Sequence, residues 1–318
     1  MNNQKQFSNL EKAIIRTLAF FDIFDYPLTL VEIHKWLYQA DKACQLAEIF
    51  EILETENLKK VIAKKHGFYF LAGREAIIQT RLERYQIAEK KFKIGLKTVR
   101  WLRWLVFVKM VAICNNSGYN NATNQSDVDF FIITSAKRLW WTRLGITLIT
   151  TILGVRRHDQ KFIDRVCLSF YISQDHLDLS DIALKPIDPY LIYWFATLVP
   201  IYDLGISQRF FASNIWFKDY LPNFYPPTLN HRRRISDNRY INFSKKFDKM
   251  ILGKKLGDFL EKVAKKLQAK KIKKYFGDSV DQKNTNVVIS ESMLKFHKTD
   301  RRQYYCDVWQ KKLNNLGL

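Results

Sequence analysis

The chain has 318 residues, of which 47% are hydrophobic and 14% aromatic, and its formal net charge is +21. So much apolar surface excludes an intrinsically disordered protein, because its burial offsets the chain entropy lost on folding. The length favours about two domains of roughly 100 to 200 residues each. The four cysteines form no CxxC motif and have no histidine at zinc-ligand spacing, so we expect reduced core thiols.

Neither the N-terminal residues nor the most apolar run of the chain suggests export or membrane insertion. The first fifteen residues contain no uninterrupted apolar segment of the signal-peptide type, which favours a cytoplasmic protein. The most apolar run, from Leu139 to Leu153, is shorter than the roughly 20 residues that cross a bilayer and contains Arg143. We therefore expect a buried helix there and no transmembrane segment.

Residues 1–85 read as a helical unit that ends in a hairpin. Helices are predicted over 10–21, after Pro27 and over 42–54, followed by two short strands around a turn at His66-Gly67. Thr29 and Glu32 have the spacing of a capping box at the second helix.

Three helices followed by a hairpin resemble a winged helix-turn-helix domain. The third helix, however, carries several glutamates, and an acidic helix is repelled by the phosphates of a DNA groove. We expect this unit to contact protein, or substrate through the lysines of its wing.

Residues 86–180 change to an alternating pattern. A helix over 84–104 precedes predicted strands over 105–114, 127–134 and 165–173, with a helix between the last two. This order predicts an α/β core with a small mixed sheet.

Two aspartates mark the second of these strands. Side chains alternate along a strand, so Asp127 and Asp129 project to one face while Val128 points to the core. Paired carboxylates near a strand end are suited to Mg²⁺, which prefers hard oxygen ligands and keeps other positions for water or phosphate. We expect Mg²⁺ here, with Mn²⁺ as a substitute.

The order of strand, polar loop, Ser-Asp-x-Asp, apolar strand and helix, over residues 105–173, resembles the DNA polymerase beta-like nucleotidyltransferase superfamily. The resemblance implies that Asp127 and Asp129 are catalytic metal ligands and that the preceding loop holds a nucleoside triphosphate. The superfamily's Gly-Ser pair aligns with Asn115 and Asn116, so its nucleotide-binding role is assigned to Asn115, Asn116, Ser117, Gly118 and Ser126.

The superfamily also uses a third carboxylate on a later strand. Neither face of the strand over 165–173 carries an acid, which leaves the flanking Asp164 and Asp175 as candidates. The resemblance therefore implies Asp127 and Asp129 as catalytic residues, with Asp164 or Asp175 completing the site.

Residues 181–318 are predicted to be helical and contain most of the net positive charge. Between His231 and Phe276 sixteen Lys and Arg stand against four Asp and Glu, a net of +12, which is expected to bind nucleic acid mainly through phosphates. A long amphipathic helix is predicted from Phe243 to Tyr275. Its apolar stripe is expected to pack on the core, although the same composition suits an anionic membrane. These residues make up the stripe: Phe247, Ile251, Phe259, Val263 and Leu267.

The predicted fold class is α+β: a winged-helix-like domain (1–85), a nucleotidyltransferase-like mixed-sheet core (86–180) and a helical, basic C-terminal region (181–318). The predicted function is Mg²⁺-dependent transfer of a nucleoside monophosphate from a triphosphate to a hydroxyl acceptor, including an acceptor on nucleic acid. Two alternatives stay open: a catalytically inactive member of this fold that serves as a nucleic-acid-binding scaffold, and a winged-helix regulator. A cluster at His297, Asp300, Arg301 and Arg302 is predicted to be a structural, salt-bridged turn.

Overall fold

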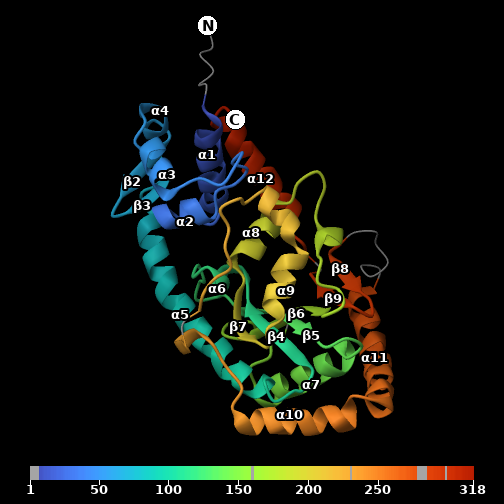
Figure 1. Cartoon of the computed structure of the whole chain (residues 1–318). Helices are drawn as coiled ribbons and strands as arrows, with labels where there is room; N and C mark the ends of the chain where they lie inside the picture. The colour runs from blue at the N-terminus through green and yellow to red at the C-terminus, as the bar shows by residue number, and fades with distance from the viewer. Residues whose placement is uncertain (1–6, 159–160, 230, 278–284, 298) are drawn as a thin grey trace.

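The N-terminal residues form a helical unit closed by a three-stranded sheet (Figure 1). The computed structural model describes residues 7–158, 161–229, 231–277, 285–297 and 299–318. The elements of this unit are α1 (Asn9–Asp22), β1 (Leu28–Thr29), α2 (Leu30–Lys35), α3 (Leu46–Leu53), α4 (Glu56–Lys59), β2 (Ile62–Lys65) and β3 (Phe68–Leu71). The strands lie in the order β1-β3-β2, and both pairings are antiparallel.

Local sequence signals set the ends of these elements. The predicted capping box is confirmed: the Glu32 amide donates to the Thr29 hydroxyl, and the Thr29 amide donates to the Glu32 carboxylate. The predicted hairpin turn is also confirmed, since His66 and Gly67 both have positive φ (50° and 79°), as a tight turn between antiparallel strands requires.

A six-stranded mixed sheet forms the centre of the rest of the chain, so the protein belongs to the α+β class. Its order is β7-β4-β5-β6-β9-β8, and only β5 and β6 are parallel. The strands are β4 (Val108–Ile113), β5 (Val128–Thr134), β6 (Val166–Ser173), β7 (Val199–Asp203), β8 (Val287–Ile289) and β9 (Met293–Phe296).

Helices cover both faces of this sheet. The helices are α5 (Ile77–Leu102), α6 (Asn115–Gly118), α7 (Leu139–Ile152), α8 (Pro189–Thr197), α9 (Ile206–Ser213), α10 (Arg239–Leu252), α11 (Lys255–Phe276) and α12 (Arg302–Asn315). One core joins the odd-numbered residues of β5, such as Phe131, to α8, α9 and the N-terminal unit. The other joins even-numbered residues, such as Phe130, to α5, α7 and α11. The final helix, α12, returns to α1, where the Trp309 indole N–H donates to the carbonyl of Arg16 at 3.0 Å.

The prediction that the chain beyond Ser180 is helical is wrong, because β7, β8 and β9 join the sheet and carry it across the 180/181 boundary. The run from Asp188 to Leu204 is predicted to be one buried helix, but α8 ends at Thr197 and β7 follows. A continuous apolar run does not distinguish a buried helix from a strand. Pro200 is tolerated in β7 because this strand lies at the sheet edge.

The helix predicted from Phe243 to Tyr275 is two helices, α10 and α11, separated at Gly253 and Lys254. The expectation that its apolar stripe packs on the core is also wrong, because all five stripe residues are exposed. Small or polar side chains form the buried face of α11 instead, with Gly257, Ala264 and Gln268 among them. None of the helices in the described part of the chain combines the length and apolar composition needed to span a bilayer.

Candidate functional site

The two aspartates lie where β4, β5 and β6 meet. Asp127 comes directly before β5, Asp129 is its second residue, and Val128 between them is fully buried on the opposite side. Cys167 on β6 is paired in register with Asp129 across the parallel strands. Ligand atoms of Asp127, Asp129 and Cys167 all lie within 4.8 Å of one another, so the strands create a three-residue cluster.

Burial and mutual repulsion dominate the electrostatics of the pair. Burial, together with the nearby charge of Asp127, raises the pKa of Asp129 to about 6, although hydrogen bonds from Asn115 and Cys167 oppose the rise. Arg157 forms an ion pair with Asp127 at 2.6 Å. Burial and both carboxylates raise the pKa of the Cys167 thiol well above its usual value, so this side chain stays protonated.

The loop after β4 approaches the pair through its first residue. Asn115 has a left-handed backbone (φ 54°), a conformation that asparagine adopts more readily than most other side chains. The Tyr190 hydroxyl donates to its Oδ1 at 3.5 Å. The side chain of Asn115 also forms a hydrogen bond with Asp129. Asn115, which was predicted to correspond to the superfamily's glycine, therefore lies beside the aspartate pair.

The remaining candidates for nucleotide contact differ in their surroundings. Asn116 accepts a hydrogen bond from the Tyr119 hydroxyl at 3.0 Å. Ser117 is buried, and its hydroxyl has no partner among the described residues. A Cβ on Gly118 would lie 2.6 Å from the carbonyl oxygen of Thr197, so this glycine permits close packing against the end of α8.

Ser126 holds the turn that precedes the pair. Its hydroxyl accepts from the Thr123 amide at 2.9 Å, and its carbonyl accepts from the buried Lys91 ammonium at 2.7 Å. Of the five residues predicted to contact nucleotide, Asn115 lines the cavity described below, whereas Asn116, Ser117, Gly118 and Ser126 do not.

Among the residues that the structure describes, no third carboxylate joins the pair. Asp164 is bound by Lys91 at 2.6 Å, and Asp175 lies beyond the far end of β6, where Ser173 donates to it. Neither belongs to the cluster around Asp127 and Asp129, whose third member is Cys167.

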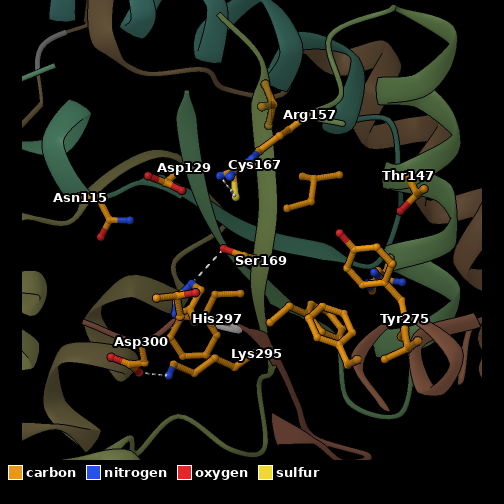
Figure 2. Close-up of a pocket in the computed structure, with 18 of the residues that line it drawn as sticks. Asn115, Asp129, Thr147, Arg157, Cys167, Ser169, Tyr275, Lys295, His297 and Asp300 are labelled. Carbon is orange, nitrogen blue, oxygen red and sulfur yellow. Dashed lines mark hydrogen bonds and ion pairs between the residues drawn. The ribbon is translucent and has the colours of Figure 1, made fainter. Parts of the chain in front are cut away.

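A cavity of about 1250 Å³ extends from Asp129 toward the C-terminal elements (Figure 2). Its lining contains eight Lys and Arg against two Asp, which favours an anionic ligand. These are the cations: Arg143, Arg156, Arg157, Lys271, Lys274, Lys295, Arg301 and Arg302. Within the described ranges, no ion pair involves four of these cations, Arg156, Lys271, Lys274 and Arg301.

The side of the cavity near β9 is a polar network. Asp300 pairs with Lys295 at 2.8 Å and with Arg302 at 2.9 Å, which confirms the salt-bridged character predicted for this turn. Burial lowers the pKa of Lys295 to about 8, and burial with the charge of Lys295 lowers the pKa of His297 to about 3. His297 is therefore neutral at physiological pH and shares a hydrogen bond with Ser169 (3.0 Å).

The donor set fits Mg²⁺ in part. Asp127 and Asp129 supply hard oxygen ligands, and a divalent cation would relieve the repulsion that raises the pKa of Asp129. The protonated thiol of Cys167 is a poor ligand for this ion. Two carboxylates are sufficient where waters and substrate phosphates complete the coordination.

No family model, curated protein or solved structure gives a significant match to the chain. The site's chemistry therefore rests on its geometry. Sequence reasoning missed Arg157, Lys91, the place of Cys167 and the cations from α11 and β9, since these residues reach the site only through packing of distant segments. The one available signal was the spacing that places Cys167 near the start of the neighbouring strand.

Proposed function

We propose that the protein is a divalent-metal-dependent nucleotidyltransferase, with Asp127 and Asp129 as its metal ligands and the basic cavity as its nucleotide site. The observation that carries this proposal is a close carboxylate pair at one end of a cavity whose other titratable groups are mainly cationic. Metal-assisted transfer from a triphosphate requires this combination, because the anionic phosphates need cations around them and the reacting phosphorus needs an ion beside it.

Different residues of the chain have different roles in the proposed transfer. Arg156, Lys271 and Lys274 provide charge for the polyphosphate, and Asn115 orients Asp129 through its carboxamide. Mg²⁺ bound by the two aspartates would neutralise charge that develops on the α-phosphate. The acceptor oxygen forms a bond to the α-phosphorus, the bond to pyrophosphate breaks, and the acceptor's proton passes to a base.

Of the two carboxylates among the described residues of the cavity lining, Asp129 is assigned to the metal, so the acceptor's proton passes to water. The cavity's other acid, Asp300, is occupied by Lys295 and Arg302. Neutral His297 is held by Ser169, and its lowered pKa makes it a weak base. The apolar residues that also line the cavity, Trp194, Tyr190 and Phe296, supply flat surfaces for a nucleobase or another apolar portion of the substrates.

A second candidate is a catalytically inactive relative that binds nucleotides or nucleic acid without transfer. Two observations favour it: Arg157 pairs with Asp127, and the third group of the cluster is the Cys167 thiol and not an acid. An arginine so placed competes with a metal ion for the carboxylate.

Transfer is tested with each α-³²P-labelled nucleoside triphosphate, Mg²⁺ or Mn²⁺, and RNA or small hydroxyl compounds as acceptors. Transfer that disappears in Asp127→Asn/Asp129→Asn but persists in Glu51→Gln/Glu83→Gln, a matched replacement of two exposed acids, supports the proposal. Transfer that survives the first double variant refutes the assigned site.

A variant that supplies the third acid separates the two candidates. Cys167→Asp adds a carboxylate next to Asp129, whereas Cys167→Ser keeps the size without the charge. For an active enzyme of this class we expect Mn²⁺ affinity, measured by titration calorimetry, to rise with Cys167→Asp alone. Absence of both Mn²⁺ binding and transfer in wild type and Cys167→Asp favours the inactive alternative.

A further inference from the structure

The outer face of α10 is apolar, although the helix belongs to the most basic part of the chain. Tyr240, Phe243, Phe247 and Met250 are 79%, 74%, 54% and 66% exposed. Their spacing places them on one side of the helix. The opposite side holds the helix to the protein, since Ile241 is fully buried.

A polar anchor fixes this orientation. The ammonium group of Lys245 is buried on the inner side of α10, where it pairs with Asp237 at 2.7 Å and donates to the Tyr202 hydroxyl. Rotation of α10 to bury its aromatic side chains would expose Ile241 and break this ion pair. The apolar face is therefore held outward by the fold.

The first half of α11 continues the same pattern. Leu256, Phe259, Val263 and Leu267 recur at helical spacing and are exposed, whereas Gly257, Ala264 and Gln268 face the protein. A Cβ on Gly257 would lie within 2.9 Å of the Arg138 guanidinium, so α11 packs closely through its small residues. We define the docking face as the exposed residues of 239–267. In Figure 1, α10 runs along the lower edge, opposite the N-terminal unit, and α11 rises along the right edge.

Lysines flank this face without anionic partners. None of its exposed lysines forms an ion pair in the described part of the chain: Lys246, Lys249, Lys254, Lys255, Lys262 and Lys266. Of the three acids in these helices, Asp248 accepts only a hydrogen bond of 3.5 Å from Ser244 among the described residues, and the other two contact the protein. Asp258 pairs with Arg138 at 2.7 Å, and Glu261 accepts hydrogen bonds from the Trp140 and Trp141 amides at 2.8 Å.

We infer that the docking face binds the surface of an anionic membrane. An interfacial helix buries an apolar stripe at the boundary of the acyl chains while lysines beside the stripe contact acidic headgroups. Aromatic residues such as Phe243 and Tyr240 are common at this depth. The face has both features, and it is independent of the proposed transfer reaction.

Charge and chemistry argue against two other occupants. A second copy of this face would bring two sets of unpaired lysines together, which like-charge repulsion disfavours. Nucleic acid would contact the lysines, but aliphatic side chains such as Met250, Leu256 and Leu267 neither stack on bases nor bind phosphate. Anionic lipid satisfies the lysines and the apolar stripe at the same time.

The full-length protein is mixed with sucrose-loaded vesicles of phosphatidylcholine alone, or of phosphatidylcholine with phosphatidylglycerol, and sedimented. We expect binding only to the anionic vesicles and weaker binding in 0.5 M salt, since screening reduces the lysine contribution. Phe243→Ser/Phe247→Ser should lower the partition coefficient at least about tenfold, because two aromatic side chains are lost from the lipid. Leu82→Ser/Tyr85→Ser on α5, where both residues are 48% exposed, is the matched control and should bind like wild type.

Circular dichroism establishes that both double variants remain folded. Three results overturn the inference. They are the absence of binding to anionic vesicles, equal binding by wild type and Phe243→Ser/Phe247→Ser, and a loss of vesicle binding in Leu82→Ser/Tyr85→Ser as large as that in Phe243→Ser/Phe247→Ser. Light scattering on the free protein and gel shift with RNA provide two further tests. If the wild type does not bind vesicles but forms a dimer or an RNA complex, and Phe243→Ser/Phe247→Ser abolishes that assembly, then the docking face binds that partner instead of a membrane.

Discussion

Replacement of Arg302 by methionine tests how much the buried ion pairs at the start of α12 contribute to the free energy of unfolding. Arg302 is 6% exposed and binds two carboxylates, Asp188 at 2.8 Å and Asp300 at 2.9 Å. It also donates to the carbonyl of Ile182 at 2.7 Å and to the hydroxyl of Thr285 at 2.6 Å. Methionine preserves much of the volume but removes every donor.

The expected loss of unfolding free energy depends on which partners Asp300 and Asp188 keep in the variant. Asp300 keeps Lys295 at 2.8 Å, whereas Asp188 loses its cation and keeps only the amides of Leu191 (2.9 Å) and Leu184 (3.1 Å). Removal of one partner from a buried ion pair costs about 3–5 kcal/mol of unfolding free energy. Because these amide contacts remain, we expect a loss near the lower end, about 3 kcal/mol.

Urea unfolding monitored by both far-ultraviolet circular dichroism and tryptophan fluorescence measures the change where the two transitions coincide. Asp188→Asn/Arg302→Met should lose less than the sum of the two single variants, since each already breaks the same contact. Lys65→Met, which breaks an exposed pair with Glu75, should cost under about 1 kcal/mol. A loss below about 1 kcal/mol for Arg302→Met, or strict additivity in the double variant, contradicts the assigned energetics.

Three further variants have defined outcomes. Gly118→Ala places a Cβ 2.6 Å from the Thr197 carbonyl oxygen and should lower the unfolding free energy by about 1–3 kcal/mol; an unchanged urea midpoint would show that the loop relaxes freely. Lys91→Met removes two hydrogen bonds to the segment before Asp127 and one to Asp164, and should speed hydrogen exchange in that segment, measured by mass spectrometry; unaltered exchange shows that Lys91 does not support it. The low pKa of His297, about 3, means that the unfolded chain binds a proton below pH 6.5 while the folded chain does not. Between pH 6.5 and 4.5 the unfolding free energy of wild type should therefore fall by up to about 2–3 kcal/mol relative to that of His297→Gln, and above pH 7.5 the difference between the two should not change with pH. A difference that is the same at every pH contradicts this.

Local features of the site were readable from the sequence. Alternation along a strand places Asp127 and Asp129 on one side, and their ligand atoms do cluster. The capping box at Thr29 and the turn at His66-Gly67 were equally readable, because each depends on contacts within a few residues. The roles assigned to the aspartates, and the proposed transfer, remain predictions.

The chemical surroundings of the pair depended on tertiary structure. Cys167 stands beside Asp129 because the parallel strands β5 and β6 pair these two residues, and Asp164 is held away from the pair by its ion pair with Lys91. The sequence determined that α10 and α11 are amphipathic, but their packing decided that the apolar side faces outward. Helical periodicity determines which side chains share a face, whereas the direction of that face depends on close packing and ion pairs with distant residues such as Arg138.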